Sequence, residues 1–383
     1  MKIIKILCLL LVLSLSATAQ QLSEKAFASL ITCGPGSDFY TSFGHTALRI
    51  CDSTQAVDLV FNYGTFDFST PHFYAKFAKG ILQYRLSVSD FASFMSEYAY
   101  EGRAVYEQKL LLSREELEKL LAALQLNYLP ENRYYAYDFF LDNCATRVRD
   151  QIENALMNRA FYPQNTEMEN ISYRQLLHPA MDEELEWWKL GIDLVLGARC
   201  DRKVPTMQYM FLPFHLKEQT DTNCIQGSTQ LLAESPELIL PSTRESHPTV
   251  LLPVYVFWGI LLLFLVLTFV ERKKKTYGCI GKTADICLYS ATSLLSLLIA
   301  FLWFFTAHYC TKWNFNLLWA NPLFIWMLIR LNKPGKVIPI ILLACCILSL
   351  IIFFARWPQY FHPAVLPIVL TLMLRICSGA QRK

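Results

Sequence analysis

Charged residues are scarce in this 383-residue chain: they make up 17% of it, whereas hydrophobic residues make up 54%. Soluble globular domains carry about 25% charged residues, so a chain that lies wholly in water is excluded, and part of this one is expected in lipid. From Thr249 onward, 13 Lys and Arg stand against two acidic residues, whereas residues 20–248 carry a net charge of −10. This acidic stretch lacks the basic surface of a nucleic-acid-binding protein, which excludes that class of partner.

The sequence also lacks Cys and His pairs at the spacings of zinc ligands, so we expect no metal and no other cofactor. It contains no internal repeat and no low-complexity segment. Neither a zinc site nor a repeat architecture is therefore expected.

The N-terminus has the features of a signal peptide. Lys2 and Lys5 precede the apolar run Ile6–Leu13, and Ala17–Ala19 supplies the small residues at which a signal peptidase cuts. We therefore expect residues 1–19 to be removed and the domain that follows to be exported.

The C-terminal part contains long apolar stretches. Three are uncharged and long enough to cross a bilayer core of ~30 Å as a helix: Val250–Val270, Ile286–Ala307 and Val337–Ala355. Two more, Leu317–Ile329 and Tyr360–Leu374, are shorter and contain prolines, so each is either spanning or re-entrant.

The distribution of basic residues favours five spans. With five spans and an exported N-terminal domain, eleven Lys and Arg lie inside and two, Lys312 and Arg356, lie outside. A re-entrant third segment would give six inside and seven outside, which conflicts with the positive-inside rule. We therefore expect an all-α bundle of five spans over residues 249–383, in the inner (cytoplasmic) membrane, with a cytoplasmic C-terminus.

Residues 20–248 are sufficient for one α+β domain. Alternating apolar residues predict strands over Phe43–Ile50, Val57–Tyr63 and Gly80–Val88. Ser113 and Glu116 form a capping-box pattern that opens an amphipathic helix ending near Asn127.

A second predicted helix start contains a candidate nucleophile. Asn143 is a good N-cap and is followed by apolar residues at a spacing of four, which places Cys144 in the first helical turn. Unpaired backbone N–H groups and the helix dipole favour a thiolate there, so we expect a lowered pKa for the Cys144 thiol. A nucleophilic thiol needs a base, and His45, near the start of a predicted strand, is the candidate.

These patterns resemble a known group of enzymes. A Gly44-His45 strand followed about a hundred residues later by Asn143-Cys144 at a helix start resembles the circularly permuted NlpC/P60 and papain-like proteins of the lecithin:retinol acyltransferase type. The Thr32–Gly36 segment, Asp142-Asn143-Cys144 and the tail with Trp313–Pro322 more closely resemble the Lnb-type lipoprotein N-acyltransferases.

The resemblance implies a thiol-dependent acyltransferase in the maturation of bacterial lipoproteins. Its donor would be a membrane phospholipid and its acceptor a diacylated lipoprotein, whose N-terminal α-amine receives the acyl chain. Cys144 would carry the acyl group as a thioester, and His45 would transfer the protons. The N-terminal domain would then lie in the periplasm.

The resemblance also implies a third residue that orients His45 from the following strand. Asn62 is the candidate, with Asp58 and Tyr63 as alternatives. Lys312 and Arg356 stand beside tryptophans on the outer side, where they either bind the donor's phosphate or belong to an interfacial belt.

Other interpretations stay open. The same thiol and imidazole would serve a membrane-tethered cysteine peptidase or amidase of the cell wall, and a non-enzymatic receptor for lipid or lipoprotein would need neither. Cys33 is an alternative nucleophile, although it lacks a helix start. Cys200 and Cys224 are a candidate disulfide pair in the exported part.

Overall fold

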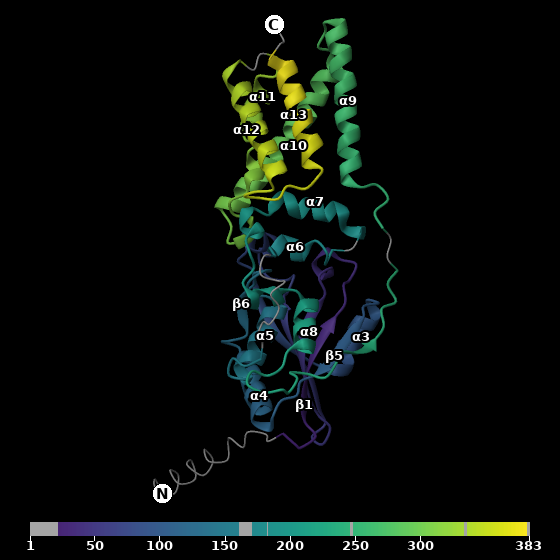
Figure 1. Ribbon diagram of the computed structural model, residues 1–383, viewed down its shortest axis with the longest axis vertical. Helices are drawn as coiled ribbons and strands as arrows, with labels where there is room; N and C mark the ends of the chain where they lie inside the picture. The colour runs from purple at the N-terminus through teal and green to yellow at the C-terminus, as the bar shows by residue number, and fades with distance from the viewer. Residues whose placement is uncertain (1–21, 161–170, 182, 246–247, 333–334, 381–383) are drawn as a thin grey trace, which may run out of the picture.

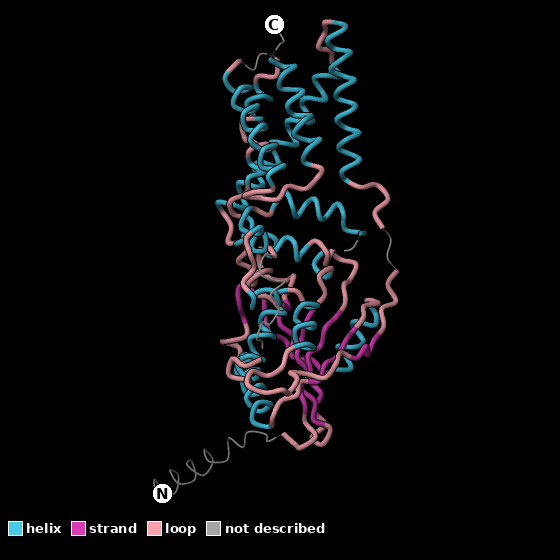
Figure 2. Tube along the Cα trace, in the orientation of Figure 1, coloured by secondary structure: helices cyan, strands magenta, loops and turns pink. Residues whose placement is uncertain are grey.

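The computed structural model describes residues 22–160, 171–181, 183–245, 248–332 and 335–380 (Figure 1). The predicted signal peptide lies outside the described residues. Strands gather in one half of the molecule and long helices in the other, with one helix lying crosswise between them (Figure 2). The chain therefore has a sheet domain and a helical bundle in contact.

The sheet domain is organised around an antiparallel sheet. In the described residues it has seven strands in the order β6-β4-β3-β2-β1-β5-β7. Their bounds are Phe27–Cys33 (β1), His45–Asp52 (β2), Val57–Thr65 (β3), Gln83–Asp90 (β4), Val105–Lys109 (β5), Tyr134–Ala136 (β6) and Glu237–Leu240 (β7). The three predicted strands correspond to β2, β3 and β4.

Both faces of the sheet are covered because its central strands are apolar on both sides. Leu30 packs in the cluster that includes Leu120 of α4 (Arg114–Tyr128) and Val148 of α5 (Cys144–Ala155). Ile31, the next residue, packs on the opposite face in the cluster that includes Phe94 of α3 (Phe91–Tyr100). Because successive side chains of a strand point to opposite faces, one sheet takes part in two hydrophobic cores.

The two predicted helix starts are present. Ser113 caps α4 with a complete capping box, since its hydroxyl accepts from the Glu116 N–H and the Glu116 carboxylate accepts from the Ser113 N–H. Asn143 caps α5 with its side-chain oxygen, which accepts from the Thr146 N–H at 2.9 Å. Local capping residues mark both helix starts.

Short helices fill the space between the sheet and the bundle. One of them, α7 (Glu186–Val195), lies across the base of the bundle (Figure 1). The other short elements are η1 (Phe39–Thr41), α2 (Phe73–Lys79), α6 (Tyr173–Leu177), η3 (Glu183–Leu185), η4 (Ala198–Asp201), η5 (Thr206–Phe211) and α8 (Pro213–Thr222). Residues of α6, η3, η4 and η5 share an apolar cluster with Cys310, a bundle residue.

Among the residues that the structure describes, the bundle contains three helices long and apolar enough to cross a membrane: α9 (Pro253–Lys274), α10 (Cys279–Phe304) and α12 (Val337–Ala355). Two shorter helices lie alongside them in the bundle, α11 (Phe324–Ile329) and α13 (Val365–Ala380). The turns η6 (Tyr309–Thr311) and η7 (Phe315–Leu317) precede α11.

The expectation of five helical spans is therefore not confirmed. The third predicted segment holds only α11, whose six residues give a helix of ~9 Å at ~1.5 Å per residue. The segment contains Asn321-Pro322, and proline cannot continue a regular helix from the residues before it. α13 has 16 residues, which gives ~24 Å and falls short of a ~30 Å core.

One end of the bundle is held by buried charges. Arg375 of α13 is fully buried and forms ion pairs with Asp285 of α10 at 2.6 Å and Glu271 of α9 at 2.9 Å. Arg375 is one of the eleven Lys and Arg expected on the inner side, and here two carboxylates offset its charge. Its pairs bring the end of α9, the start of α10 and the end of α13 together.

Candidate functional site

His45 is the first residue of β2 and follows a glycine that the chain geometry requires. Gly44 has φ +79°, and a Cβ there would lie 2.6 Å from the carbonyl oxygen of Cys33. The tight turn aims the His45 ring at β3, where Nε2 donates to Asn62 Oδ1 at 2.5 Å. With Nε2 carrying the proton, Nδ1 is the nitrogen of the neutral ring that can accept one.

Asn62 is the partner of His45, and the two alternatives are engaged elsewhere. Asp58 pairs with Arg49 at 2.7 Å. The Tyr63 hydroxyl donates to Asn127 Oδ1 at 3.3 Å, on the face that packs against α4. The structure thus brings together the two residues that sequence reasoning placed on neighbouring strands.

Cys144 lies at the start of α5, where its cap is fixed from several sides. The Asn143 side-chain amide donates to the carbonyl oxygens of Phe139 and Phe211 at 2.8 and 2.7 Å. The Cys144 thiol accepts from the backbone N–H of Thr46, the residue that follows His45. The paired register of β2 and β3 begins only at Leu48 and Phe61, so the strands diverge where the thiol is placed.

Burial sets the protonation of both groups. It raises the pKa of Cys144 to about 11, although backbone N–H groups of Thr46, Ala145 and Cys144 itself oppose that shift. It lowers the pKa of His45 to about 4. The expectation of a lowered thiol pKa is therefore wrong, because desolvation of the thiolate outweighs the hydrogen bonds of the helix start. Both groups are neutral at pH 7.

Cys33 is a poorer nucleophile. Its side chain is completely buried, and burial raises its pKa to about 12. It packs on the α3 face of the sheet beside Tyr98, which hydrogen-bonds to it. A substrate ester has no access to this thiol in the described structure.

The two predicted outer cations behave differently. The Lys312 ammonium donates to the carbonyl oxygens of Trp303 and Thr306 at 3.4 and 3.1 Å, which satisfies the end of α10. Arg356 is exposed at the end of α12. No described contact joins Lys312 or Arg356 to His45 or Cys144. Lys312 instead caps the C-terminal end of α10.

The candidate disulfide between Cys200 and Cys224 is not formed in the structure. Cys200 is buried, and its thiol is hydrogen-bonded with the thiol of Cys310, not with Cys224. Cys224 instead lies at an isolated bridge with Leu231. Sequence reasoning did not pair Cys200 with Cys310, because Cys310 lies in the bundle, more than a hundred residues later in the chain.

An apolar cluster separates the candidate site from the bundle. Phe43, two residues before His45, packs on Phe139 with ring centroids 4.9 Å apart. Both join the cluster that contains Phe211 and, from the bundle, Tyr309 and Cys310. The site therefore lies at the bundle-facing end of the sheet, next to side chains that exclude water.

Arg103 is a neighbour that sequence reasoning missed. It is 4% exposed, donates from Nε to the Gly34 carbonyl at 2.8 Å, and stacks on Tyr98. One of its terminal nitrogens has no hydrogen-bond partner among the described residues. Its charge helps to lower the pKa of both His45 and Cys144. It follows Gly102 in a turn, and no sequence pattern marks it.

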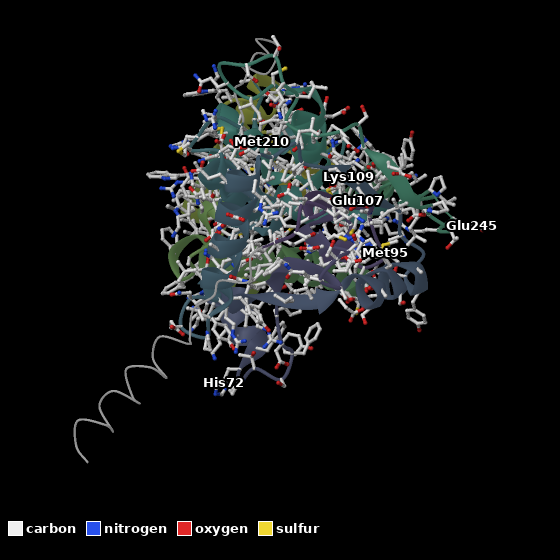
Figure 3. The ribbon with its side chains drawn as sticks, turned by 90° about the horizontal axis from the view of Figure 1, so that it is seen from below. His72, Met95, Glu107, Lys109, Met210 and Glu245 are labelled. Carbon is white, nitrogen blue, oxygen red and sulfur yellow. The ribbon has the colours of Figure 1, made fainter. Side chains whose placement is uncertain are left out.

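Other site chemistry is not evident in the part of the chain that the structure describes. Those residues include no group of three or more His, Cys, Asp and Glu side chains that could hold a metal ion. His72 lies at the periphery of the domain in the view from below, away from the sheet (Figure 3).

Comparisons with known proteins identify the family of both parts of the chain. Residues 16–178, which include His45, Asn62 and Cys144, match the family model of the Lnb N-terminal periplasmic domain. Residues 245–382 match that of the Lnb transmembrane domain. The chain belongs to the Lnb family. This Lnb protein is a membrane protein with a periplasmic domain.

No curated protein and no solved structure matches the chain. The relation of this Lnb domain to permuted papain-like folds therefore stays a prediction. Residues 179–244 lie between the two family matches and hold α7 and η4, which touch the bundle.

Proposed function

We propose that this Lnb protein is a lipoprotein N-acyltransferase. It takes an acyl chain from a membrane phospholipid and delivers it, through a thioester on Cys144, to the α-amine of an N-terminal diacylglyceryl-cysteine. The observation that carries the proposal is the Asn62–His45 hydrogen bond beside the Thr46 N–H that contacts the Cys144 thiol. A nucleophile, a base and a residue that orients the base meet at the end of the sheet that faces the bundle.

The first half-reaction acylates the enzyme. Cys144 Sγ attacks the carbonyl carbon of the donor ester while His45 Nδ1 takes the thiol proton. The ester C–O bond then breaks, and His45 returns the proton to the leaving lysophospholipid oxygen. Because burial keeps both groups neutral at rest, proton transfer accompanies attack. The N–H groups around the sulfur are placed to share the oxyanion on the attacked carbon.

The second half-reaction acylates the lipoprotein. The acceptor's α-amine attacks the thioester carbonyl, the new C–N bond forms and the C–S bond breaks. His45 takes a proton from the amine and returns it to the Cys144 sulfur, which restores the starting thiol. The surrounding apolar cluster slows the competing attack by water.

The proposal includes five passes through the inner membrane, two of them irregular. Part of the third pass is enclosed in protein, since Asn316, Trp319, Ala320 and Phe324 are buried, whereas Pro322 itself is exposed. Non-helical backbone is tolerated at membrane depth when protein surrounds it. A third segment that is only partly helical therefore still crosses the membrane in this proposal. With five crossings, the C-terminus lies on the side opposite the periplasmic domain.

Intact-protein mass spectrometry tests the reaction. The full-length protein in nanodiscs of one defined phospholipid should gain the mass of one acyl group, and hydroxylamine should remove it. A peptide with an N-terminal diacylglyceryl-cysteine should then receive that mass. Cys144→Ser should abolish the thioester, whereas the control Cys51→Ser, at the far end of β2, should retain it.

The alternatives predict other outcomes. A cell-wall peptidase would cleave a muropeptide and leave the phospholipid intact. A receptor would bind lipid without a covalent increment. An unchanged acyl increment in Cys144→Ser would overturn the proposal.

A further inference from the structure

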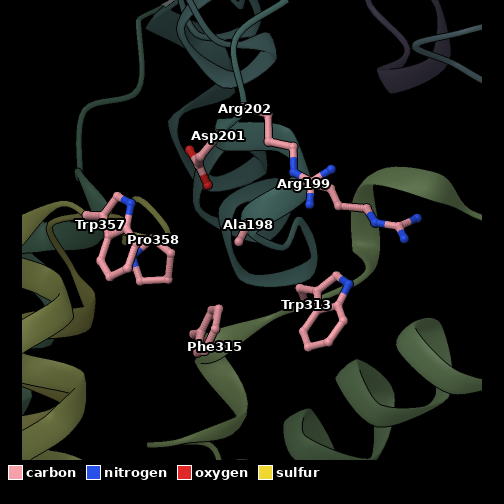
Figure 4. Close-up of a pocket in the computed structure, with 8 residues that line it drawn as sticks. All are labelled: Ala198, Arg199, Asp201, Arg202, Trp313, Phe315, Trp357 and Pro358. Carbon is pink, nitrogen blue, oxygen red and sulfur yellow. The ribbon is translucent and has the colours of Figure 1, made fainter.

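A cavity of about 400 Å³ lies where the sheet domain meets the bundle (Figure 4). The domain contributes Ala198, Arg199, Asp201 and Arg202, and the bundle contributes Trp313, Phe315, Trp357 and Pro358. Its volume lies within the ~300–1,000 Å³ typical of small-molecule sites. The cavity contains none of the residues of the candidate active site.

The cavity carries an excess of positive charge. Its one acidic lining residue, Asp201, is already bound by Arg174, with contacts of 2.8 and 3.1 Å to its two carboxylate oxygens. Arg199 and Arg202 form no ion pair among the described residues, and Arg199 Nε is buried without a hydrogen-bond partner. The Arg199 guanidinium stacks on the Tyr309 ring at 4.6 Å, which holds it in place. Two available guanidinium groups favour an oxyanion ligand.

The cavity also has the position of a lipid headgroup. Trp313 and Trp357 are 52% and 75% exposed, and both lie in turns that leave the ends of spans. Exposed tryptophans at such places mark the interface between membrane and water. An anion that reaches a site rimmed by interfacial tryptophans is a phosphate attached to acyl chains rather than a freely soluble one.

The cavity exists only because the two halves of the protein approach closely. The N–H groups of Gly197 and Ala198 donate to the carbonyl oxygens of Cys310 and Trp313 at 2.8 and 3.0 Å. A Cβ at Gly197 would overlap with the Lys312 carbonyl, so glycine is required there. These contacts fix Arg199 and Arg202 opposite the tryptophans before any ligand binds.

We propose that this cavity binds the phosphate of an anionic glycerophospholipid and is the headgroup subsite for the acyl donor. Arg199 and Arg202 contact the phosphate oxygens, and Trp313 and Trp357 pack on the glycerol and upper acyl segments. The role as donor subsite rests on the proposed acyl transfer, whereas the binding of the lipid does not.

Native mass spectrometry of the full-length protein tests binding. Phosphatidylglycerol retained by the wild type should be reduced at least ten-fold in the double variant Arg199→Gln/Arg202→Gln. Arg199→Lys/Arg202→Lys should recover part of the binding, which shows that the variants fold. Lys273→Gln/Lys274→Gln, which removes two exposed cations from the other end of the bundle, should bind like the wild type. Diacylglycerol, which lacks the phosphate, should not distinguish the variants.

Acyl-enzyme formation gives the second readout. The Gln double variant should raise the KM for phosphatidylglycerol at least ten-fold and leave acylation by a small soluble thioester unchanged. Equal retention of phosphatidylglycerol by wild type and Gln variant would overturn the subsite, as would full displacement of the lipid by millimolar inorganic phosphate. Arginine-dependent binding without any acylation of Cys144 would instead keep the lipid site and reject the proposed acyl transfer.

Discussion

The side-chain amide of Asn314 donates a hydrogen bond of 2.8 Å to the backbone carbonyl of Leu194, 120 residues earlier in the chain. Asn316 donates to the Asp193 carbonyl at 3.1 Å, and Gln359 to the Leu196 carbonyl at 3.0 Å. The last carbonyls of a helix have no partner within it, so the bundle satisfies the end of α7. The Trp313–Pro322 segment thus docks the periplasmic domain.

Asn314→Ala should weaken this docking. Loss of the amide removes one of the two hydrogen bonds to the Leu194 carbonyl, which keeps only that from Asn316 at 3.2 Å. It also leaves the buried Asn316 N–H without its acceptor, which costs about 1–3 kcal/mol. Thermal unfolding of the full-length protein in nanodiscs should begin at a lower temperature, and limited proteolysis between the domain and the bundle should be faster. Asn154→Ala, at an exposed position of α5, is the matched control and should leave both unchanged. Identical proteolysis of the two variants would contradict the docking role.

Asn62→Ala should lower the rate of Cys144 acylation without weakening phospholipid binding. The hydrogen bond to Nε2 orients the ring, and a bond of this kind is worth about 1–3 kcal/mol, or roughly five- to a hundred-fold in rate. Asn62→Asp should recover part of kcat because a carboxylate still accepts from Nε2. It should also raise the His45 pKa and move the acidic limb of the pH–rate profile upward. A KM effect alone would argue against an orienting role.

The thiol should react slowly at neutral pH. Burial raises the Cys144 pKa to about 11, and His45, with its pKa lowered to about 4, supplies no imidazolium to stabilise a thiolate. Alkylation of Cys144 by iodoacetamide, followed on the Cys144 peptide by mass spectrometry, should therefore keep rising up to about pH 11. A plateau below pH 8 would show a preformed thiolate–imidazolium pair and contradict the structure.

The same shift of His45 links folding to pH. Its pKa falls from 6.5 in the unfolded chain to about 4 in the fold, so the unfolded state binds the proton first as the pH drops. The stability that neutral His45 contributes is present above pH 6.5 and is lost as the pH falls toward 4. His45→Gln should flatten this part of the stability profile, measured by denaturant unfolding between pH 4 and 7.

Asp285→Ala should destabilise the bundle. It leaves the fully buried Arg375 without one of its two carboxylate partners, and breaking a buried ion pair costs about 3–5 kcal/mol. Combining it with Arg375→Leu should cost less than the single change, because the charge of the three that then remains, on Glu271, is 11% exposed rather than fully buried. Unfolding by denaturant in detergent measures both. A double variant weaker than Asp285→Ala would show that the pair is itself a net source of stability.

The direction of the chain through the membrane is open to a direct test. A reporter fused after Lys383 should be active in the cytoplasm, and one inserted in the turn after Ala307 should be active in the periplasm, because that turn meets α2 through the Lys79 carbonyl. Periplasmic activity of the C-terminal fusion would contradict five passes.

The parts of the site that sequence predicts well are those set by neighbouring residues. Asn143 caps α5 because its own oxygen reaches Thr146, and Gly44 turns the chain so that His45 begins a strand. The Asn62–His45 contact required one further idea, that the two strands are adjacent. Short-range rules and a family resemblance sufficed for these residues.

The parts that sequence predicts poorly depend on distant contacts. The thiol pKa was expected to fall because a helix start is visible in sequence, whereas the burial that raises it comes from the packed sheet. The sequence leaves Lys312 either at the donor phosphate or in an interfacial belt, whereas its ammonium caps α10 in the structure. Arg199 gains its place from Tyr309 in the bundle, and no local pattern records that approach.

Gly197 has a consequence for how the protein can be divided. The second family match begins at residue 245, but the parts of the protein before and after this boundary each depend on contacts with the other. Cutting there would expose to water the carbonyls of Leu194 and Leu196 and the apolar side of α7. The periplasmic part is thus not an independent folding unit. A methyl group at Gly197 would clash with the Lys312 carbonyl and force the two halves apart.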